Sequence, residues 1–140
     1  FDGVAVTTDL ITGFPGETEE EFGKTLDFIR KCGFAAMHVF PYSVRPGTKA
    51  ASMPGQLTHA VKDARAREAQ KIAAEMQREY LDAQIGKVLP VLFETEQPDG
   101  WHGHSDNYCE VAAAGGALHG IMRNVKITAR SGEKLIGNIV

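Results

Sequence analysis

The sequence has few cysteines, and the two that it has lie far apart. Its 140 residues contain Cys32 and Cys109, which match no metal-ligand spacing. Isolated thiols suit a reducing compartment, so we expect a cytoplasmic protein with buried thiols. Because thiolates must stand in close groups to hold zinc or an iron–sulfur cluster, the sequence predicts no metal site within this chain.

Long apolar runs and an excess of one charge are also missing. No run approaches the roughly 20 residues of a membrane span, and no basic segment precedes an apolar one as in a signal peptide. We therefore expect no membrane partner. The net charge of -3 gives no overall attraction to nucleic acid. Phe1-Asp2-Gly3 leads almost at once into an apolar stretch without an initiator Met, and we expect a piece of a longer protein.

The strongest local pattern present is a strand that feeds a helix through a tight turn, over residues 9–22. The apolar residues before the turn favour a strand, which Gly13, Pro15 and Gly16 interrupt. Thr18 and Glu21 form a capping box, which predicts a helix from about residue 19 to 31. A plain strand-to-helix connection has the same features, so the pattern alone does not require a ligand.

A second strand is predicted over residues 37–40, after a helix stop at Gly33. Strand, helix and strand in this order predict a parallel pair with a right-handed crossover, and such a pair needs more sheet than this chain provides. The loop over residues 41–48 then carries Ser43 and Arg45 at the end of a strand, where ligands bind in such units. A solvated loop and a ligand or phosphate contact both remain open.

The rest of the chain predicts a long helix and then a small all-β domain. The helix runs from Thr58 to about Gln84, with balanced charges typical of a solvated outer face. Short strands with turns at regular spacing follow, over residues 88–95, 107–112, 121–129 and 134–140. They predict a small antiparallel barrel or sandwich. The predicted domains are therefore 1–83 and 84–140.

Three stretches taken together resemble one family. These are residues 9–22, residues 38–50 and residues 85–87 after the long helix. They resemble the C-terminal part of the radical-SAM tRNA methylthiotransferases, and residues 38–50 look most like the branch acting on N6-threonylcarbamoyladenosine. The final strands, with Gly103, Asn107-Tyr108 and Leu135-Ile136-Gly137, resemble the TRAM domain of that family.

The resemblance implies a fold and an activity. The fold class would be α/β followed by all-β: the last βαβ of a partial radical-SAM (TIM-like) barrel, a long helix, and a small antiparallel TRAM (OB-like) β-barrel. The parent enzyme would methylthiolate C2 of the modified adenosine beside the tRNA anticodon. It would use S-adenosylmethionine and two 4Fe–4S clusters, one of them held by a CxxxCxxC loop. This chain has no such loop, so we expect it to be inactive without the N-terminal part of the enzyme.

The resemblance also implies site residues. An S-adenosylmethionine pocket would include six residues: Ile11, Gly13, Phe40, Tyr42, Ser43 and Arg45. Charge and aromatic character suggest five further residues, in the predicted β-domain, for the tRNA anticodon stem-loop: Trp101, Tyr108, Arg123, Lys126 and Arg130. A half-buried aromatic at Trp101 and scattered surface charge are the open alternative. A surface that binds RNA strongly by itself is expected to be positively charged, whereas the charge of residues 83–140 is near neutral. The open strand edges of the partial radical-SAM barrel would promote homo-oligomers.

Other interpretations are less specific. The chain could be a non-catalytic RNA-binding barrel that serves as an interaction module, or part of another radical-SAM enzyme. The histidines in residues 101–104, with Cys109 and His119, do not have the spacing of a zinc module. His38 lies within a predicted strand and is expected to be a hydrogen-bonded core histidine. No catalytic side-chain set is predicted.

Overall fold

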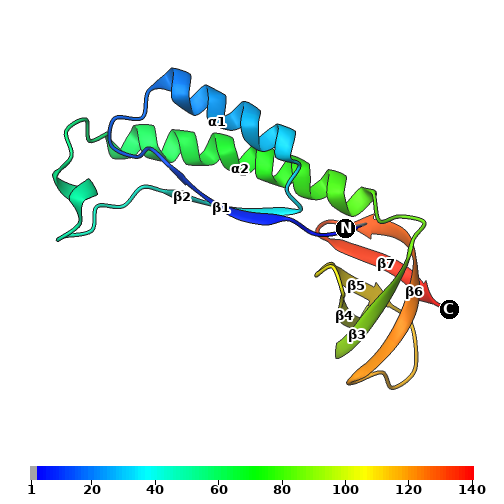
Figure 1. Cartoon of the computed structure of the whole chain (residues 1–140). Coiled ribbons are helices and arrows are strands. Elements are labelled where there is room, and N and C mark those ends of the chain that lie inside the picture. Colours follow the sequence, from blue (N-terminus) through cyan, green and yellow to red (C-terminus); the bar gives the residue numbers. More distant parts are fainter. Residues whose placement is uncertain (1–2) are drawn as a thin grey trace. The chain divides into compact units, whose positions relative to one another are not determined.

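A computed structural model describes residues 3–140, which form two compact units (Figure 1). Residues Val6–Met76 make up the first, here called the αβ unit. Residues Gln77–Val140, with the described residues up to Ala5, make up the second, the barrel unit. Contacts thus divide the chain at Gln77, within a helix, and the domain limits 1–83 and 84–140 remain predictions. Phe1 and Asp2, where the sequence suggested an abrupt start, lie outside the described residues.

The αβ unit has the predicted strand–helix–strand order. Strand β1 (Thr7–Thr12) pairs in parallel with β2 (Ala36–Pro41), and helix α1 (Glu19–Cys32) connects them. The capping box is confirmed, since Thr18 Oγ1 accepts from the Glu21 N–H (3.1 Å) and Glu21 Oε2 accepts from the Thr18 N–H (2.9 Å). Gly33 ends the helix in the left-handed region, with φ 61°.

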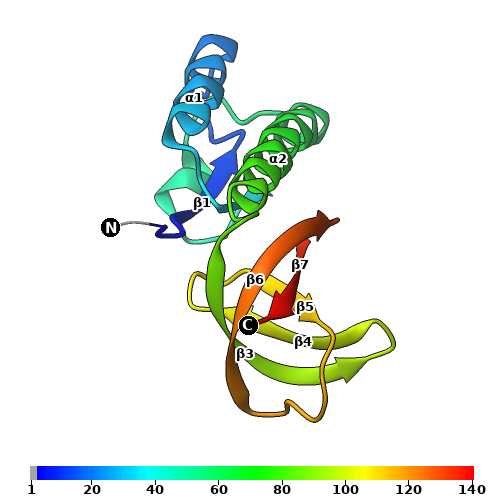
Figure 2. The ribbon, with the colours of Figure 1, turned by 90° about the vertical axis from the view of Figure 1, so that its right-hand side faces the viewer.

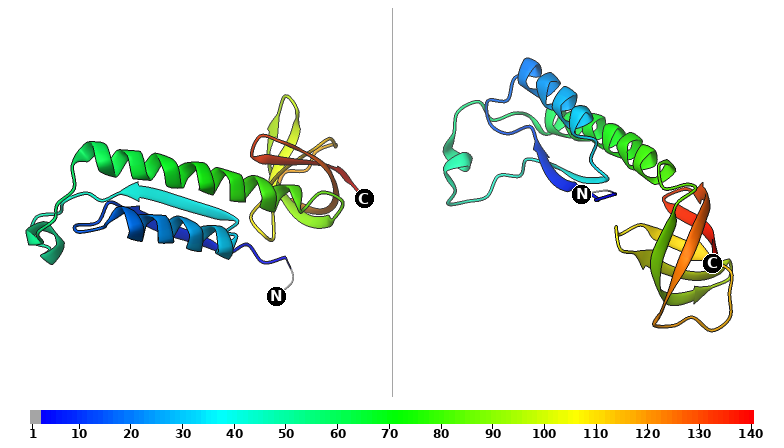
Figure 3. Two further views of the ribbon diagram at one scale, coloured as in Figure 1. Left: turned by 90° about the horizontal axis from the view of Figure 1, so that it is seen from above. Right: turned by 45° about the vertical axis from the view of Figure 1, so that its right-hand side comes forward.

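The core of the αβ unit lies between the sheet and two helices. A short 3₁₀ helix, η1 (Lys49–Ser52), precedes the long helix α2 (His59–Asp82). Figure 3 shows α1 and α2 on the same side of β1 and β2. The predicted apolar stripe of α1 (Phe22, Leu26, Ile29) is buried against Ala69, Ile72 and Met76 of α2. The opposite face of the sheet carries Ile11 and Phe40, both exposed, in register across the two strands.

The barrel unit is a closed five-stranded barrel, visible in Figure 2. Its strands are β3 (Val88–Gln97), β4 (Gly100–Ser105), β5 (Glu110–Ala113), β6 (Ile121–Ser131) and β7 (Lys134–Ile139), in the order β3-β4-β5-β7-β6. The prediction of a purely antiparallel barrel is wrong at one seam, because β5 and β7 pair in parallel. Four strands were predicted, and β4 was not among them.

The barrel interior is filled by apolar side chains from all five strands. Val91, Phe93, Val111, Val125 and Leu135 are fully buried there. Fully burying a side chain of this size contributes roughly 1.5–3 kcal/mol. Tyr80 and Leu81, near the end of α2, pack on the same core. Within residues 3–140, none of the helices is both long and apolar enough to cross a bilayer.

Candidate functional site

A cavity of about 420 Å³ lies at the carboxyl ends of β1 and β2. Five of the six residues predicted for the cofactor line it: Ile11, Phe40, Tyr42, Ser43 and Arg45. Pro41, Thr48 and Ala50 complete the lining. The carboxyl end of parallel strands is where ligands bind in βαβ folds. The structure thus brings together residues that are far apart in the sequence.

Strand pairing and one loop turn set the shape of this cavity. The Tyr42 N–H donates to the Thr12 carbonyl (2.8 Å), which continues the parallel pairing beyond β2. Thr48 then closes the loop, because its Oγ1 donates to the Arg45 carbonyl at 2.8 Å. The loop therefore folds back and keeps Ser43 and Arg45 beside the strand ends.

The cavity wall is mainly aromatic and apolar. The Phe40 ring stacks on His38, with 6.4 Å between ring centroids and 9° between planes. His38 is exposed, so its prediction as a core histidine is wrong: its strand position faces the side without helices. The Tyr42 ring meets Phe14 edge-on at 5.3 Å, and Lys62 Nζ lies 5.5 Å from its centroid. Flat apolar walls with a few polar groups suit an uncharged base.

Gly13 supports the cavity through its backbone and does not line it. Its φ is 72°, and its N–H donates to Glu17 Oε1 (3.0 Å). A Cβ at this position would lie 2.5 Å from Lys62 Cγ. Glycine is therefore needed here for both conformation and space. Its predicted role in cofactor contact stays a prediction.

Arg65 is a site-supporting residue that the sequence prediction missed. Its side chain, expected on a solvated face, is buried, with only 5% of the residue exposed. Nη1 donates to the Glu17 carbonyl (2.8 Å) and to Glu17 Oε1 (2.6 Å), and Nη2 donates to Glu19 Oε1 (2.6 Å). A signal was present, because Arg65 stands four residues after Val61 and four before Ala69, on the buried stripe of α2.

The structure separates the two aromatic residues predicted to stack on RNA. Trp101 is 7% exposed and belongs to the barrel core, so its prediction as an exposed stacking platform needs correction. The cause is its place on β4, where alternate side chains point into the barrel. Tyr108 is 87% exposed and lies between β4 and β5.

The three predicted cations all lie on β6, but their surroundings differ. Arg123 and Lys126 are exposed. The Lys126 ammonium donates to the Gly86 carbonyl. Arg130 donates from Nε to Asp82 Oδ1 (2.6 Å) and from Nη2 to Oδ2 (3.2 Å), and this hydrogen bond lowers the pKa of Asp82. The Arg130 charge is therefore already balanced.

The histidines and the one cysteine among the described residues of the barrel unit do not share a site. His102 is buried, with Nε2 2.8 Å from Asp99 Oδ1 and Nδ1 3.0 Å from Glu110 Oε1. The hydrogen bond from His102, followed by that from Lys134, lowers the pKa of Asp99 to about 2. Burial raises the pKa of the Cys109 thiol. Within residues 3–140, no three His, Cys, Asp or Glu side chains are grouped for a metal ion.

The chain is similar to enzymes that modify tRNA. No family model matches it. It is 42% identical over 118 residues to the threonylcarbamoyladenosine tRNA methylthiotransferase MtaB of Bacillus subtilis, covering 81% of this chain and 26% of that protein. It is 40% identical over 139 residues to the tRNA-2-methylthio-N(6)-dimethylallyladenosine synthase of Maricaulis maris, covering 97% of this chain and 30% of that protein.

A synthase of the same name from a Mycobacterium species is 47% identical over 91 residues, covering 65% of this chain and 17% of that protein. The names of these homologues thus belong to two branches of tRNA methylthiolation. The chain spans less than a third of the length of the curated relatives it matches. Its homologues are tRNA methylthiotransferases.

Proposed function

We propose that this chain is the C-terminal part of a radical-SAM tRNA methylthiotransferase. Residues 1–83 would end its radical-SAM domain and residues 84–140 would be its TRAM domain. The enzyme would methylthiolate C2 of N6-threonylcarbamoyladenosine beside the anticodon. The similarity to named tRNA methylthiotransferases supports the enzyme class, and the resemblance in residues 38–50 supports the threonylcarbamoyl branch.

The cavity at the ends of β1 and β2 fits part of an S-adenosylmethionine site. Ile11 and Phe40 offer apolar surface to the adenine, and the loop after β2 offers backbone and hydroxyl groups. The Arg45 guanidinium suits a carboxylate or phosphate bidentately. When bound, S-adenosylmethionine supplies the radical source and the methyl group. The residues of this chain would bind and orient it.

The residues of this chain do not fit an iron–sulfur cluster. The two cysteines differ in environment, Cys32 being exposed at the end of α1 and Cys109 buried in the barrel. A cluster needs several thiolates around one centre. We propose that the clusters are held by residues elsewhere in a longer protein.

One observation carries the proposal: four residues assigned to one cofactor by resemblance, and Arg45, assigned by its charge, line one cavity at the carboxyl ends of parallel strands. The sequence alone could not show that these residues share one cavity, because the walls of the cavity come from β1, β2 and the loop after β2. The cavity would bind the cofactor, and the barrel unit would bind RNA through Tyr108, Arg123 and Lys126.

The test is to disrupt the gene that encodes this chain and to analyse tRNA nucleosides by mass spectrometry. We expect the loss of 2-methylthio-N6-threonylcarbamoyladenosine. If the 2-methylthio-N6-dimethylallyl nucleoside is lost instead, the enzyme belongs to the dimethylallyl branch. An unchanged nucleoside profile would contradict methylthiotransferase activity and favour a non-catalytic RNA-binding module.

Two variants of the complete gene product then test the cavity. Phe40→Asp and Arg45→Gln should weaken S-adenosylmethionine binding, measured by calorimetry, and leave tRNA binding unchanged. Arg30→Gln, at an exposed residue of α1 that does not line this cavity, is the matched control. Equal cofactor affinity in all three variants would contradict the assignment of this cavity.

A further inference from the structure

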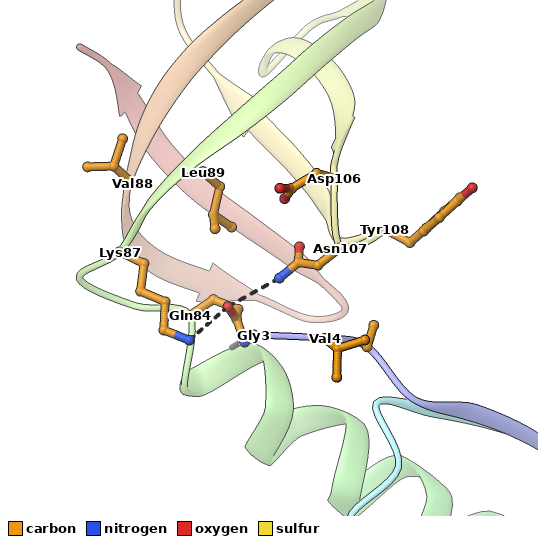
Figure 4. Close-up of a pocket in the computed structure, with 10 residues that line it drawn as sticks. Gly3, Val4, Gln84, Lys87, Val88, Leu89, Asp106, Asn107 and Tyr108 are labelled. Atoms are coloured by element: carbon orange, nitrogen blue, oxygen red, sulfur yellow. Dashed lines mark hydrogen bonds between the residues drawn. The ribbon is translucent and has the colours of Figure 1, made fainter. Parts of the chain in front are cut away.

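We propose that the barrel unit binds a short single-stranded RNA segment at a second cavity, with one base on Tyr108 and a backbone phosphate on Lys87. This site rests on the proposed RNA-binding function and gives it a location. The cavity measures about 730 Å³ and lies where the end of α2 and the start of β3 meet the loop between β4 and β5 (Figure 4).

The floor of this cavity is a buried amide that joins two of its walls. Gln84 is 2% exposed. Its Oε1 accepts from Lys87 Nζ (3.2 Å) and from Asn107 Nδ2 (3.3 Å), as drawn in Figure 4. Its Nε2 donates to the Tyr80 carbonyl (2.9 Å), which fixes the amide. Gln84 therefore positions a cation and a polar donor on the two sides of one cavity.

Both of those donors have further N–H groups for a ligand. An ammonium has three N–H groups and an amide nitrogen two, and the bonds to Gln84 use one of each. Lys126, which pairs with Val88 across the β3–β6 ladder and bonds Gly86, adds a second positive charge beside Lys87. The Asp106 carboxylate lies on the opposite side of the cavity, next to Asn107 (Figure 4). The charge distribution therefore favours a phosphate on the Lys87 side.

Tyr108 supplies an aromatic surface at the edge of the same cavity. It is the one non-glycine residue with positive φ (61°) among residues 3–140, and its side chain extends away from the cavity into solvent (Figure 4). Left-handed backbone is unfavourable for a tyrosine and is found mainly where the surroundings enforce it.

The loop that presents Tyr108 is held firmly by hydrogen bonds. The Tyr108 N–H donates to the Ser105 carbonyl (3.0 Å), and the Ser105 N–H donates to the Cys109 carbonyl (3.0 Å). Ser105 Oγ donates to Asn107 Oδ1 (2.6 Å) and accepts from the Cys109 N–H (3.0 Å). An exposed aromatic ring on a hydrogen-bonded loop, with a cation across the same cavity, provides one surface for base stacking and one charge for a phosphate, the two contacts that single-stranded nucleic acid uses (Figure 4).

The test uses fluorescence anisotropy of the 140-residue chain with a labelled anticodon stem-loop RNA, across a salt series. Tyr108→Gly removes the ring and suits the left-handed backbone, so the fold should be at least as stable by thermal unfolding. RNA affinity should fall at least about fivefold, since one stacked base is lost. Tyr108→Phe keeps the ring and should bind within about twofold of the original chain.

The phosphate contact has its own variant and control. Lys87→Gln should reduce the slope of log affinity against log salt by about 0.7, the value for one phosphate on a single strand. Lys31→Gln, an exposed lysine in the last turn of α1, should leave the slope unchanged. If the original chain shows no salt-dependent RNA binding, the proposed RNA-binding function fails, and this site with it. If the original chain binds and Tyr108→Gly binds equally well, only this site is overturned.

Discussion

Arg65 of α2 and Glu17 of the turn after β1 form an ion pair of 2.6 Å across 48 residues of sequence. The same carboxylate accepts from the Gly13 N–H through Oε1 (3.0 Å). The pair therefore links the long helix to the backbone at the end of β1, next to the cavity that Ile11 lines. Because Arg65 is buried, it needs these partners to offset its desolvation.

Removing that guanidinium should destabilise the αβ unit. For Arg65→Met we expect the free energy of unfolding to fall by about 3 kcal/mol, since Glu17 is left partly buried without its partner. Arg67→Met, two residues further along α2 and exposed, should change it by less than about 0.5 kcal/mol. Urea unfolding followed by circular dichroism measures both. Equal stability of the two variants would contradict a structural role for Arg65.

The sequence predicted the αβ unit well because its signals are local. The capping box at Thr18, the stop at Gly33 and the apolar stripe of α1 are each defined within a few residues, and each is confirmed. Arg65 was missed because its partners come from a distant turn, and charge alone suggested solvent. Only its place on the apolar stripe of α2 indicated burial.

The barrel was predicted less well because its pairing is non-local. Strand β4 has two glycines and two histidines and lacks the alternation of apolar and polar residues that marks a strand. The parallel seam between β5 and β7 has no local signal at all. The same limitation left Trp101 open between a stacking platform and a half-buried aromatic, since its burial depends on β4 closing the barrel.

Gly103 should be essential for that closure. A Cβ there would lie far closer to the Leu92 carbonyl oxygen on the neighbouring strand β3 than van der Waals contact allows. We expect Gly103→Ala to cost at least about 2 kcal/mol, because backbone atoms must move to accept it. Gly116→Ala is the matched control, as a Cβ there meets no atom within 4 Å. Thermal unfolding measures the stability of both variants. Equal stability would contradict a close approach of β4 to β3 at Gly103.

Asp99 should make the barrel unit sensitive to acid. Hydrogen bonds from His102 and Lys134 lower the pKa of its carboxyl from 3.8 to about 2. A carboxyl with a lowered pKa in the folded state adds stability above its unfolded pKa, and this stability is lost as pH falls through the folded pKa. The contribution should therefore disappear between about pH 4 and pH 2.

The measurement is urea unfolding at several pH values within that window. Asp99→Asn should show a shallower loss of stability on acidification than the original chain. Lys134→Gln removes the weaker of the two hydrogen bonds and should give an intermediate slope. Identical pH profiles for the original chain and Asp99→Asn would rule out this coupling.

Arg123 and Arg130 should contribute unequally to RNA binding, although both lie on β6. The Arg130 guanidinium already bonds both oxygens of Asp82, whereas the exposed Arg123 donates, among the described residues, only to the Met122 carbonyl (3.3 Å). A phosphate contact by Arg130 would have to break its ion pair first. We expect Arg123→Gln to reduce the salt slope of RNA binding by about 0.7 and Arg130→Gln to leave it nearly unchanged. The reverse order would show that the Asp82–Arg130 pair opens when RNA binds.

The open face of the two-stranded sheet should make this chain self-associate. Ile11 and Phe40 are exposed cross-strand neighbours there, and a pair of strands leaves backbone groups available for further pairing. Sedimentation equilibrium should show a concentration-dependent mass for the original chain. Phe40→Glu should shift it towards the monomer, because a charge is costly to bury at such a contact. Phe28→Glu alters a phenylalanine that is even more exposed, on the outer face of α1, and should leave association unchanged. A monomer at all concentrations would contradict association, and equal effects of the two variants would place it on another surface.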